Sequence, residues 1–299
     1  MARDEPRWEA YRSFLAVMTE GSLSAAARRL ALTQPTLGRH IDELEDALGQ
    51  KLFTRSQTGL IPAQAARELL PHAQAMASAA DALVRASSAG ALDERGTVRL
   101  TASRIVGAEV LPAILTSFHE KYPGIAIELV LTDVAEDLLK READIAVRMV
   151  RPKQESLVAK KIGTVRLGLF AHRRYLARHG TPQSIDDAPQ HTLIGFDRET
   201  AMVRSLRDRG MKLTRDMFGL RSDNDLAQIA ALRAGYGLGV CQLGIARRDP
   251  DLVHILPTKF IYDLEMWLCM HKDLRGTHRM RLLFDHLAMG LDGYVKGSR

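Results

Sequence analysis

Residues 14–55 read FLAVMTEGSLSAAARRLALTQPTLGRHIDELEDALGQKLFTR, and this stretch decides the fold of the N-terminal part of the chain. Apolar residues at helical spacing predict a first helix over 8–20, which ends at Gly21. Ser22 offers a hydroxyl group that can cap a second, shorter helix over 25–30. Two short helices in succession, rich in Ala, Leu and Arg, predict an all-α beginning.

A third helix follows after a short turn. Thr33 is placed to cap it, and Pro35 falls in its first turn, where a missing N–H costs nothing. Gly49 is placed to end it. Its apolar residues recur on one face, at Leu37, Ile41, Leu44 and Leu48. Because this face must be buried against the first two helices, the opposite side of the helix is expected to face solvent.

That exposed side predicts a helix-turn-helix that recognises double-stranded DNA. The second helix of such a pair fits the major groove, where Gln can pair with adenine and Arg with guanine or a phosphate. The acidic residues fall in later turns, away from the base-reading end, at Asp42, Glu43, Glu45 and Asp46. The residues predicted to contact DNA are Ser22, Arg28, Arg29, Thr33, Gln34, Pro35, Thr36, Arg39 and Arg55. A helical cap with solvated charges is the alternative explanation of the pattern.

An extended segment over 51–62 predicts a two-stranded wing with its tip at Thr58 and Gly59. An Ala-rich helix over 64–89 follows, and it has too few large apolar residues to form a globular core. A second copy of the chain is therefore expected to pair with it. A hinge is predicted at its end. The predicted domains are a winged helix-turn-helix (1–63), a linker or dimerisation helix (64–90) and a C-terminal domain (91–299).

Composition bounds the class of protein without pointing to the DNA-binding segment. The 299 residues are 46% hydrophobic and 26% charged, which is typical of a globular protein with more than one domain. No apolar run reaches the roughly 18 residues of a membrane span, and the charged start lacks a secretory signal. Two isolated cysteines, Cys241 and Cys269, suit a cytoplasmic protein without disulfides. The net charge of +6 lies after residue 90, since acidic and basic residues cancel before it.

From Thr97 onward, short strands alternate with helices, which predicts βα units and a mostly parallel sheet. The predicted strands are 97–101, 125–131, 143–149, 165–171, 192–196, 213–220, 238–242 and 262–271. The predicted helices are 105–121, 134–140, 174–178, 226–234 and 277–295. The fold class is therefore α/β with an all-α N-terminal part.

The segment 14–55 resembles the N-terminal domain of LysR-type transcriptional regulators. The matching elements are Gly21-Ser22, Ala25-Ala26-Ala27, Leu30, Gln34-Pro35, Ile41, Leu44-Glu45, Leu48-Gly49 and Leu52-Phe53-x-Arg55. The order of winged helix, linker helix and αβ domain also matches, so the resemblance covers essentially the whole chain, strongly before residue 97 and weakly after it. The chain departs from the family at Gly38, where Ser is usual on the reading helix. It departs again at 62–65, where Thr-x-x-Gly is usual.

The resemblance implies two Rossmann-like lobes of the periplasmic-binding-protein type, with a small effector held in the cleft between them. Lobe one would cover about 97–165 and 266–299, and lobe two about 166–265. The effector would modulate DNA binding or transcription activation. The chain would assemble as a homo-oligomer, either as a dimer through the linker helix or as a tetramer that also uses the αβ domains.

Two predicted helix N-termini, after Ser103 and Ser222, favour a carboxylate-like effector, since helix N-termini attract anions. The positive charge of the domain agrees with this. Thr132 and Phe196 match positions that line the cleft in the family. The predicted effector contacts are Ser103, Arg104, Thr132, Arg148, Phe196, Ser222 and Asp223. The alternatives are plain helix capping by the serines, an ion pair between Arg148 and a nearby acid, and burial of Phe196 in the core.

Two other functional classes remain as alternatives. An enzyme on a doubly wound α/β fold would need convergent acid, base or nucleophilic residues, and the sequence has no GxSxG motif. A solute-binding protein would need a signal peptide and no helical N-terminal domain. The ten histidines show no metal-binding spacing, so no metal or cofactor is predicted. The glycines of 235–239 precede a strand instead of following one, which indicates a turn and not a nucleotide loop.

Overall fold

The computed structural model forms two compact units that divide near Ser87. The residues that the structure describes are 5–56, 59–87, 94–133, 143–152, 156–208, 210–211 and 213–298. No helix among them is long and apolar enough to cross a lipid bilayer.

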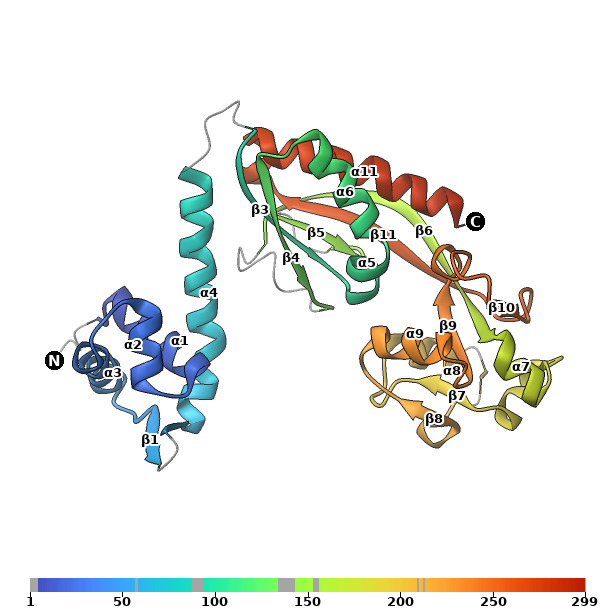
Figure 1. Ribbon diagram of the computed structural model, residues 1–299, viewed down its shortest axis with the longest axis horizontal. Coiled ribbons are helices and arrows are strands. Elements are labelled where there is room, and N and C mark those ends of the chain that lie inside the picture. Colours follow the sequence, from blue (N-terminus) through green and yellow to red (C-terminus); the bar gives the residue numbers. More distant parts are fainter. Residues whose placement is uncertain are drawn as a thin grey trace. The chain divides into compact units, whose positions relative to one another are not determined.

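The first unit contains three short helices, a hairpin and one long helix (Figure 1). Its elements are α1 (Trp8–Glu20), α2 (Leu23–Leu30), α3 (Gln34–Leu48), β1 (Phe53–Ser56), β2 (Gly59–Pro62) and α4 (Gln64–Ser87). Strands β1 and β2 pair antiparallel, which confirms the wing. The predicted tip residue Thr58 and the hinge after Ser87 lie outside the described residues.

Local sequence signals set the helix ends of this unit as expected. The Ser22 hydroxyl accepts a hydrogen bond from the backbone N–H of Ala25 at 3.3 Å. The Thr33 hydroxyl accepts one from the N–H of Thr36 at 3.3 Å. Gly21 and Gly49 end α1 and α3 in the left-handed conformation, with φ of 70° and 68°. These caps fix the angle at which α3 leaves the turn.

The second unit is built on one mixed sheet with the strand order β4-β3-β5-β11-β6-β9-β7-β8, and β10 pairs with β6. In chain order, the first four strands of this unit are β3 (Gly96–Ala102), β4 (Ile125–Leu131), β5 (Ile145–Arg148) and β6 (Leu157–His172). The later strands are β7 (Leu193–Gly195), β8 (Phe218–Arg221), β9 (Leu238–Gln242), β10 (Leu252–Ile255) and β11 (Tyr262–His271).

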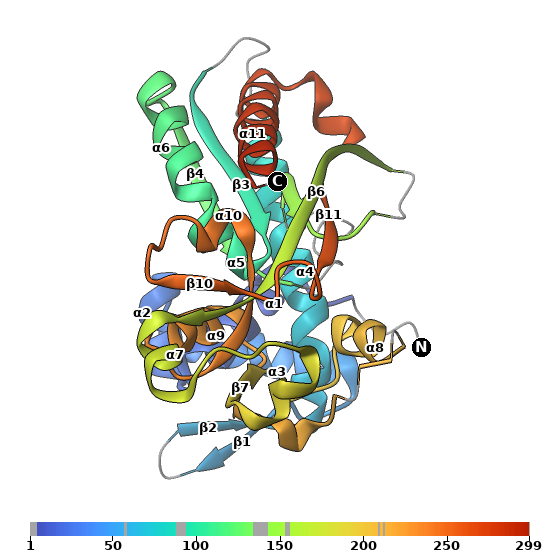
Figure 2. The same ribbon diagram turned by 90° about the vertical axis from the view of Figure 1, so that its right-hand side faces the viewer.

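Two long strands join the two lobes of this unit. Strands β6 and β11 pair antiparallel along nearly all of β11 (Figure 2). Strand β11 also pairs with β5 in one lobe, while β6 also pairs with β9 in the other. The expected parallel pairing holds within each lobe, for β3 with β4 and for β7 with β8. The expectation of parallel pairing is wrong for β6 and β11. The chain leaves one lobe along β6 and returns along β11, so these two strands run in opposite directions.

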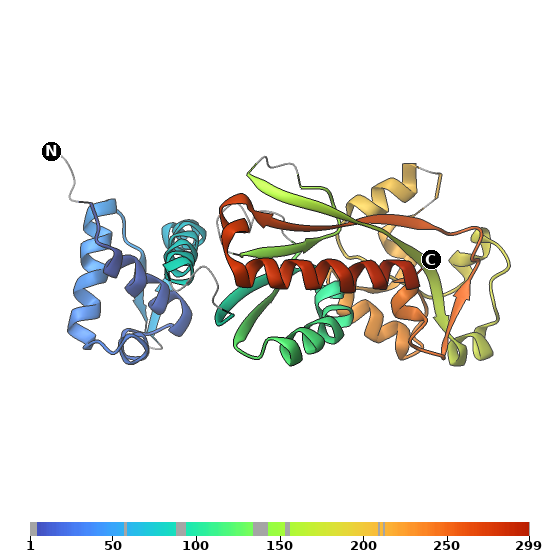
Figure 3. The same cartoon turned by 90° about the horizontal axis from the view of Figure 1, so that it is seen from above.

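Helices cover both lobes, and α11 lies along β6 and packs against α6 (Figure 3). The helices are α5 (Arg104–Glu109), α6 (Leu111–Lys121), α7 (Arg173–His179), α8 (Ala201–Asp208), α9 (Asp225–Arg233), α10 (Leu243–Ala246) and α11 (His278–Gly297). The largest buried cluster includes Leu100, Phe118, Leu268 and Leu287. This core continues from lobe one into lobe two, where it includes Ile194 of β7 and Leu232 of α9.

The secondary-structure predictions for this unit need several corrections, and β10 and α10 were not predicted at all. The helix predicted over 105–121 is two helices, because the first ends before Val110 and the second begins after it, next to Pro112. The strand predicted near 213–220 exists, but it begins later than expected. A 3-10 turn occupies Arg215–Met217, and the strand is Phe218–Arg221. Helix α8 was absent from the prediction, and the helix predicted over 134–140 lies outside the described residues.

Candidate functional site

Helix α3 separates an apolar face from a polar one. Leu37 and Leu44 are fully buried against the cluster formed with α1, α2 and the wing. Thr33, Gln34, Pro35 and Arg39 are exposed, and Thr36 is half-buried. The Thr33 and Thr36 hydroxyls lie 2.8 Å apart. The first turn of α3 therefore presents polar groups to solvent from a rigidly packed helix.

The basic side chains predicted to contact DNA differ in how they are held. Arg29 forms an ion pair with Glu20 at 3.1 Å, and Arg39 lies 3.7 Å from Glu43. Arg28 is exposed, with no ion-pair partner among the residues that the structure describes. Arg55 lies on β1, but its side chain is outside the described part. Since the two ion pairs are solvent-exposed, a DNA phosphate can compete for either arginine at little cost.

Glu45 holds the wing to α3, a role that the sequence analysis missed. Its side chain is 5% exposed, and its Oε1 accepts hydrogen bonds from the backbone N–H of Leu52 at 2.8 Å and of Phe53 at 3.2 Å. Lys51 donates to its Oε2 at 2.5 Å. Burial acts to raise the pKa of Glu45, but these hydrogen bonds outweigh it and lower the pKa. The carboxylate thus stays charged and fixes the start of β1.

A signal for this role was present in the sequence. Glu45 lies four residues after Ile41 and eight residues after Leu37, on the same face of the helix. An acid on the buried face of a helix is rarely tolerated unless it is paired. Its spacing therefore separates Glu45 from the solvated acids around it, such as Asp42 and Asp46.

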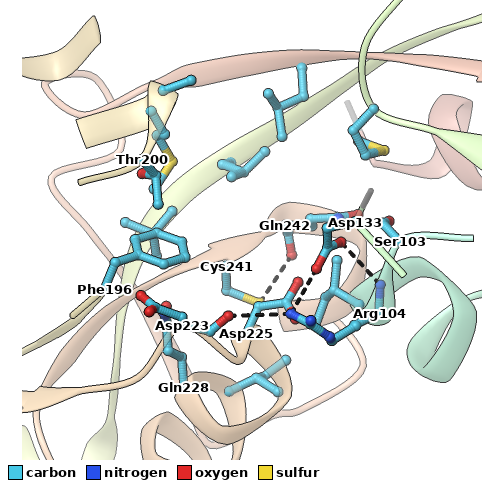
Figure 4. Close-up of a pocket in the computed structure, with 18 of the residues that line it drawn as sticks. Ser103, Arg104, Asp133, Phe196, Thr200, Asp223, Asp225, Gln228, Cys241 and Gln242 are labelled. Carbon is cyan, nitrogen blue, oxygen red and sulfur yellow. Dashed lines mark hydrogen bonds and ion pairs between the residues drawn. The ribbon is translucent and has the colours of Figure 1, made fainter. Parts of the chain in front are cut away.

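The second candidate site is a cleft of about 570 Å³ between the lobes of the αβ unit. Six of the seven predicted effector residues line it, namely Ser103, Arg104, Thr132, Arg148, Phe196 and Asp223 (Figure 4). Ser222 does not. The sequence analysis missed Asp133, Arg198, Asp225, Gln228, Cys241 and Gln242, which also line it. These come from strand ends and helix starts that meet only through the fold.

Ser103 is a buried hydroxyl at the edge of the cleft. It was expected to cap the following helix, but its side chain makes no capping hydrogen bond. The residue is 9% exposed, and its Oγ has no hydrogen-bond partner among the described residues. A buried hydroxyl without a partner is costly, so it marks a position where a ligand can be bound.

Ser222 behaves differently from Ser103. Its hydroxyl accepts a hydrogen bond from the N–H of Asn224 at 3.2 Å. Asn224, not Ser222, caps α9, because its Oδ1 accepts from the N–H of Leu226 at 3.0 Å. The expected helix therefore does begin after Ser222-Asp223-Asn224, with Asn224 as its cap, and Asp223 lines the cleft where Ser222 does not.

A polar network spans the two lobes at the cleft. The Arg104 guanidinium lies 2.8 Å from the Asp133 carboxylate and donates to the backbone oxygen of Asp223 at 3.3 Å (Figure 4). Oδ1 of Asp223 accepts the N–H groups of Asp197 at 3.0 Å and Arg198 at 2.9 Å. Arg104 thus joins lobe one to the start of α9 in lobe two.

Two further ionisable groups in the cleft are shielded from water. Arg148 is 5% exposed and donates to the hydroxyl of Thr101 at 3.2 Å and to the carbonyl of Val147 at 3.3 Å. Burial raises the pKa of Asp225, and the charge of Asp133 raises it further. Both effects disfavour the charged form of Asp225.

A bidentate ion pair ties the lobes together near the cleft. Arg233 of α9 donates to both oxygens of Glu109 of α5, at 2.7 and 2.8 Å. These hydrogen bonds lower the pKa of Glu109 against the opposing effect of burial. Arg248 also donates to the Glu109 carbonyl at 2.6 Å. Such planar, two-pronged pairing fixes both distance and orientation, so it restrains how the lobes face each other.

The two cysteines, Cys241 and Cys269, form no disulfide, as expected, and both are buried. Burial raises the pKa of the Cys241 thiol to about 12 and that of Cys269 to about 11. Thiols held protonated in this way are poor nucleophiles. Among the described residues, no group of His, Cys, Asp and Glu could hold a metal ion.

Both units match known protein families. Residues 8–67 match the bacterial regulatory helix-turn-helix proteins of the lysR family, and residues 91–292 match the LysR substrate binding domain. A probable HTH-type transcriptional regulator LtrA from Klebsiella pneumoniae is 28% identical over 293 residues, with 95% of each chain covered. The HTH-type transcriptional regulator CrgA of Neisseria meningitidis serogroup C is 30% identical over 183 residues, which cover 61% of each chain.

Solved structures share the fold. CbnR complexed with its target DNA aligns over 95% of this chain and 99% of its own, with a TM-score of 0.68 and 21% identity. CrgA of Neisseria meningitidis aligns over 96% of this chain and 99% of its own, with a TM-score of 0.59 and 22% identity. The order of the two units is therefore that of a known full-length architecture.

Proposed function

The chain belongs to the LysR family of DNA-binding transcriptional regulators, and from this we propose that α3 reads its operator and that a small anion in the interlobe cleft modulates the response. The enzyme alternative loses its support, because the relatives and structural neighbours are regulators. The observation that carries the proposal is the division of α3 into a buried apolar face and an exposed polar first turn.

The first turn of α3 suits the major groove. Gln34 and Arg39 are the long polar side chains on its exposed side, and Gln and Arg make bidentate contacts with adenine and guanine edges. Thr33, Thr36 and the hydroxyl of Ser22 lie near backbone N–H groups, which suits phosphate contacts that set the register. Arg28, Arg29 and Arg55 are assigned to phosphates. Structural neighbours include a protein bound to its target DNA.

A gel-shift assay on the intergenic region beside the gene tests DNA binding directly. We expect binding at low salt that weakens steeply as salt rises. Gln34→Ala should lower affinity for the operator by about tenfold or more and relax base preference, since a bidentate base contact contributes about 1–3 kcal/mol. No shift at low salt with wild type would overturn the proposal.

Charge removal needs a matched control. Arg28→Ala should reduce the slope of log affinity against log salt by about 0.9, the value for one lost phosphate contact. Arg204→Ala on α8 removes the same charge from the other unit and should leave that slope unchanged. If both variants change it equally, the effect is one of net charge and the assigned contact is wrong.

The cleft supports an anionic effector through three groups. Ser103 offers a buried hydroxyl, Arg148 a buried guanidinium, and Asp225 a carboxyl group whose pKa is raised by burial. We assign the anion to Ser103 and Arg148, which both line the cleft. A library of small carboxylates should include compounds that raise the melting temperature of the αβ unit, and a neutral amide of the same shape should not.

Helix α4 supports self-association. Met76, Leu83 and Val84 are exposed on it, and Leu83 and Val84 are 66% and 68% exposed. Exposed apolar side chains along one helix suit pairing with another helix. We assign α4 to a dimer, and a pseudo-palindromic operator with half-sites about one helical turn apart follows from it. Leu83→Glu should shift the mass measured by light scattering toward the monomer.

A further inference from the structure

A second cavity of about 450 Å³ lies inside lobe two, between α8 and the sheet. We call it the lobe-two chamber. Its wall includes Leu193, Val203, Leu206, Met217, Phe218 and Leu238. Of its described lining side chains, Asp186 and Gln228 are the polar ones, and Asp186 is exposed. The Gln228 amide already donates to the Ser222 carbonyl at 2.7 Å. The interior of the chamber is therefore apolar.

The chamber adjoins the interlobe cleft. Phe196, Met202, Gln228 and Val240 line both spaces, so these four residues form the boundary between them. Phe196 is labelled at the cleft in Figure 4. Methionine is unbranched and rotates freely, so Met202 can move aside for a ligand more readily than a branched side chain could. The two cavities are thus separated by a movable boundary.

The wall of this chamber favours an apolar occupant, because most of the side chains that line it are apolar. Removing apolar surface from water is favourable, and apolar cavities take up apolar molecules. An apolar group that enters from the cleft would therefore gain free energy in the chamber.

We propose that the effector is an amphiphile, with its polar head at Ser103 in the cleft and its apolar segment in the lobe-two chamber. This inference rests on the proposed function of the cleft and adds the chemical class of the ligand. The head binds where the buried hydroxyl lacks a partner, and the tail passes the boundary of Phe196 and Met202. Burial of the tail supplies affinity, while the polar head gives orientation.

Two homologous series test this on the full-length wild-type protein. Straight-chain alkanoates from acetate to decanoate, and the matching alkanols, are titrated by calorimetry. Each methylene that enters the chamber should tighten binding about fourfold, until the chamber is filled and the gain stops. The alkanols make the test independent of the head group. If neither series binds more tightly with chain length, α8 closes the chamber in solution and the proposal is wrong.

A filling variant locates the tail. Val203→Phe places a larger side chain in the chamber, and we expect the gain with chain length to disappear while the binding of propionate is unchanged. Val253→Phe is the matched control, because Val253 is 37% exposed on β10 and lines neither cavity. Leu206→Phe, on the same helix as Val203, is the second filling variant should the first fail to fold. An unchanged gain in either folded filling variant would overturn the proposal.

The outcome separates this inference from the proposed function. Binding of short acids that depends on Ser103, without any gain for longer chains, would leave the cleft as the effector site and remove the amphiphile. Loss of DNA binding in the gel shift would overturn the regulator proposal, whatever the chamber holds. A gain in affinity with length that Val203→Phe removes, and Val253→Phe does not, supports the amphiphile directly.

Discussion

The reading helix and the interlobe cleft of this chain are assembled in opposite ways. The polar groups of α3 come from one short stretch, Thr33 to Arg39, and they are exposed. Those of the cleft come from strand ends and helix starts spread between Ser103 and Gln242, and several are buried. A surface that reads DNA can be held by local geometry, whereas a site for a small ligand needs the complete tertiary fold.

The two regions also differ in how their polar groups are satisfied. On α3 the Thr33 and Thr36 hydroxyls pair with each other, and Arg39 lies near Glu43. In the cleft, the Ser103 hydroxyl is buried without a partner among the described residues. The surface proposed to read DNA therefore already has internal polar contacts, while the buried hydroxyl in the cleft has a hydrogen bond left to make.

The largest effect should come from Leu44→Ala, which tests whether the reading helix depends on its own unit. Leu44 is fully buried, so the change should lower the free energy of unfolding of the first unit by about 2–5 kcal/mol. DNA binding in the gel shift should be lost. Differential scanning calorimetry should show the transition of the αβ unit unchanged.

Leu268→Ala is the matched change on the other side. Leu268 is fully buried on β11, so its loss should destabilise the αβ unit and leave the first unit's transition unchanged. If either variant lowers both transitions equally, the two units unfold as one. The contrast between a local and an assembled site would then no longer describe the stability of the molecule.

Glu45→Ala should have the next largest effect, because it removes the acceptor for two backbone N–H groups at the start of the wing. Leaving the backbone N–H groups of Leu52 and Phe53 without this acceptor should lower the free energy of unfolding by about 1–3 kcal/mol and weaken DNA binding. Asp46→Ala removes an exposed acid from the same turn and should change the stability by less than about 0.5 kcal/mol. Equal effects of the two changes would show that charge, not the hydrogen bonds, matters here.

The same residue makes a prediction about pH. The pKa of Glu45 is lower in the folded state than its usual value of about 4.3. Its contribution to stability is therefore complete above that value and is lost as the pH falls through the folded pKa. Glu45→Gln keeps an oxygen acceptor but does not titrate in this range. The free energy of unfolding, measured by chemical denaturation, should fall less between pH 7 and pH 3.5 for Glu45→Gln than for wild type.

The same contrast explains how much the sequence could reveal. Helices α1 to α3, their caps and the exposed side of α3 were predictable, because each depends on residues a few positions apart. The boundary at Val110 and the antiparallel course of β6 and β11 were not, because they depend on packing between distant segments. Ser222 looked equivalent to Ser103 in sequence, yet the turn at Asn224 directs its hydroxyl to a backbone N–H. The lobe-two chamber has no sequence signal, since a cavity depends on how side chains from many strands meet.

A smaller effect is expected for Ser103→Ala, on the cleft side of the comparison. Because the hydroxyl makes no hydrogen bond to the described residues, its removal should leave the melting temperature unchanged or slightly higher. Affinity for the effector, or for the alkanoate probes, should fall about threefold to tenfold, which corresponds to one hydrogen bond. Ser222→Ala is the control, since Ser222 lines no part of the cleft and should not alter ligand affinity. A Ser103→Ala protein that binds every probe as wild type does would place the head group elsewhere.

The smallest effect is expected at Gly38, and it asks whether the reading surface is as complete as its local hydrogen bonds suggest. A Cβ at this position would meet no atom within 4 Å, and the residue does not need a positive φ, so a side chain fits without strain. Gly38→Ser should stabilise α3 by about 0.5 kcal/mol through helix propensity, and the operator should be bound at least as tightly. Gly38→Ala adds a somewhat larger gain in propensity without a hydroxyl. If Ala and Ser tighten DNA binding alike, the glycine only loosens the helix. If Ser alone does so, the hydroxyl makes a DNA contact that this chain lacks, and weaker binding by Ser would show that the glycine is needed where backbone and DNA come close.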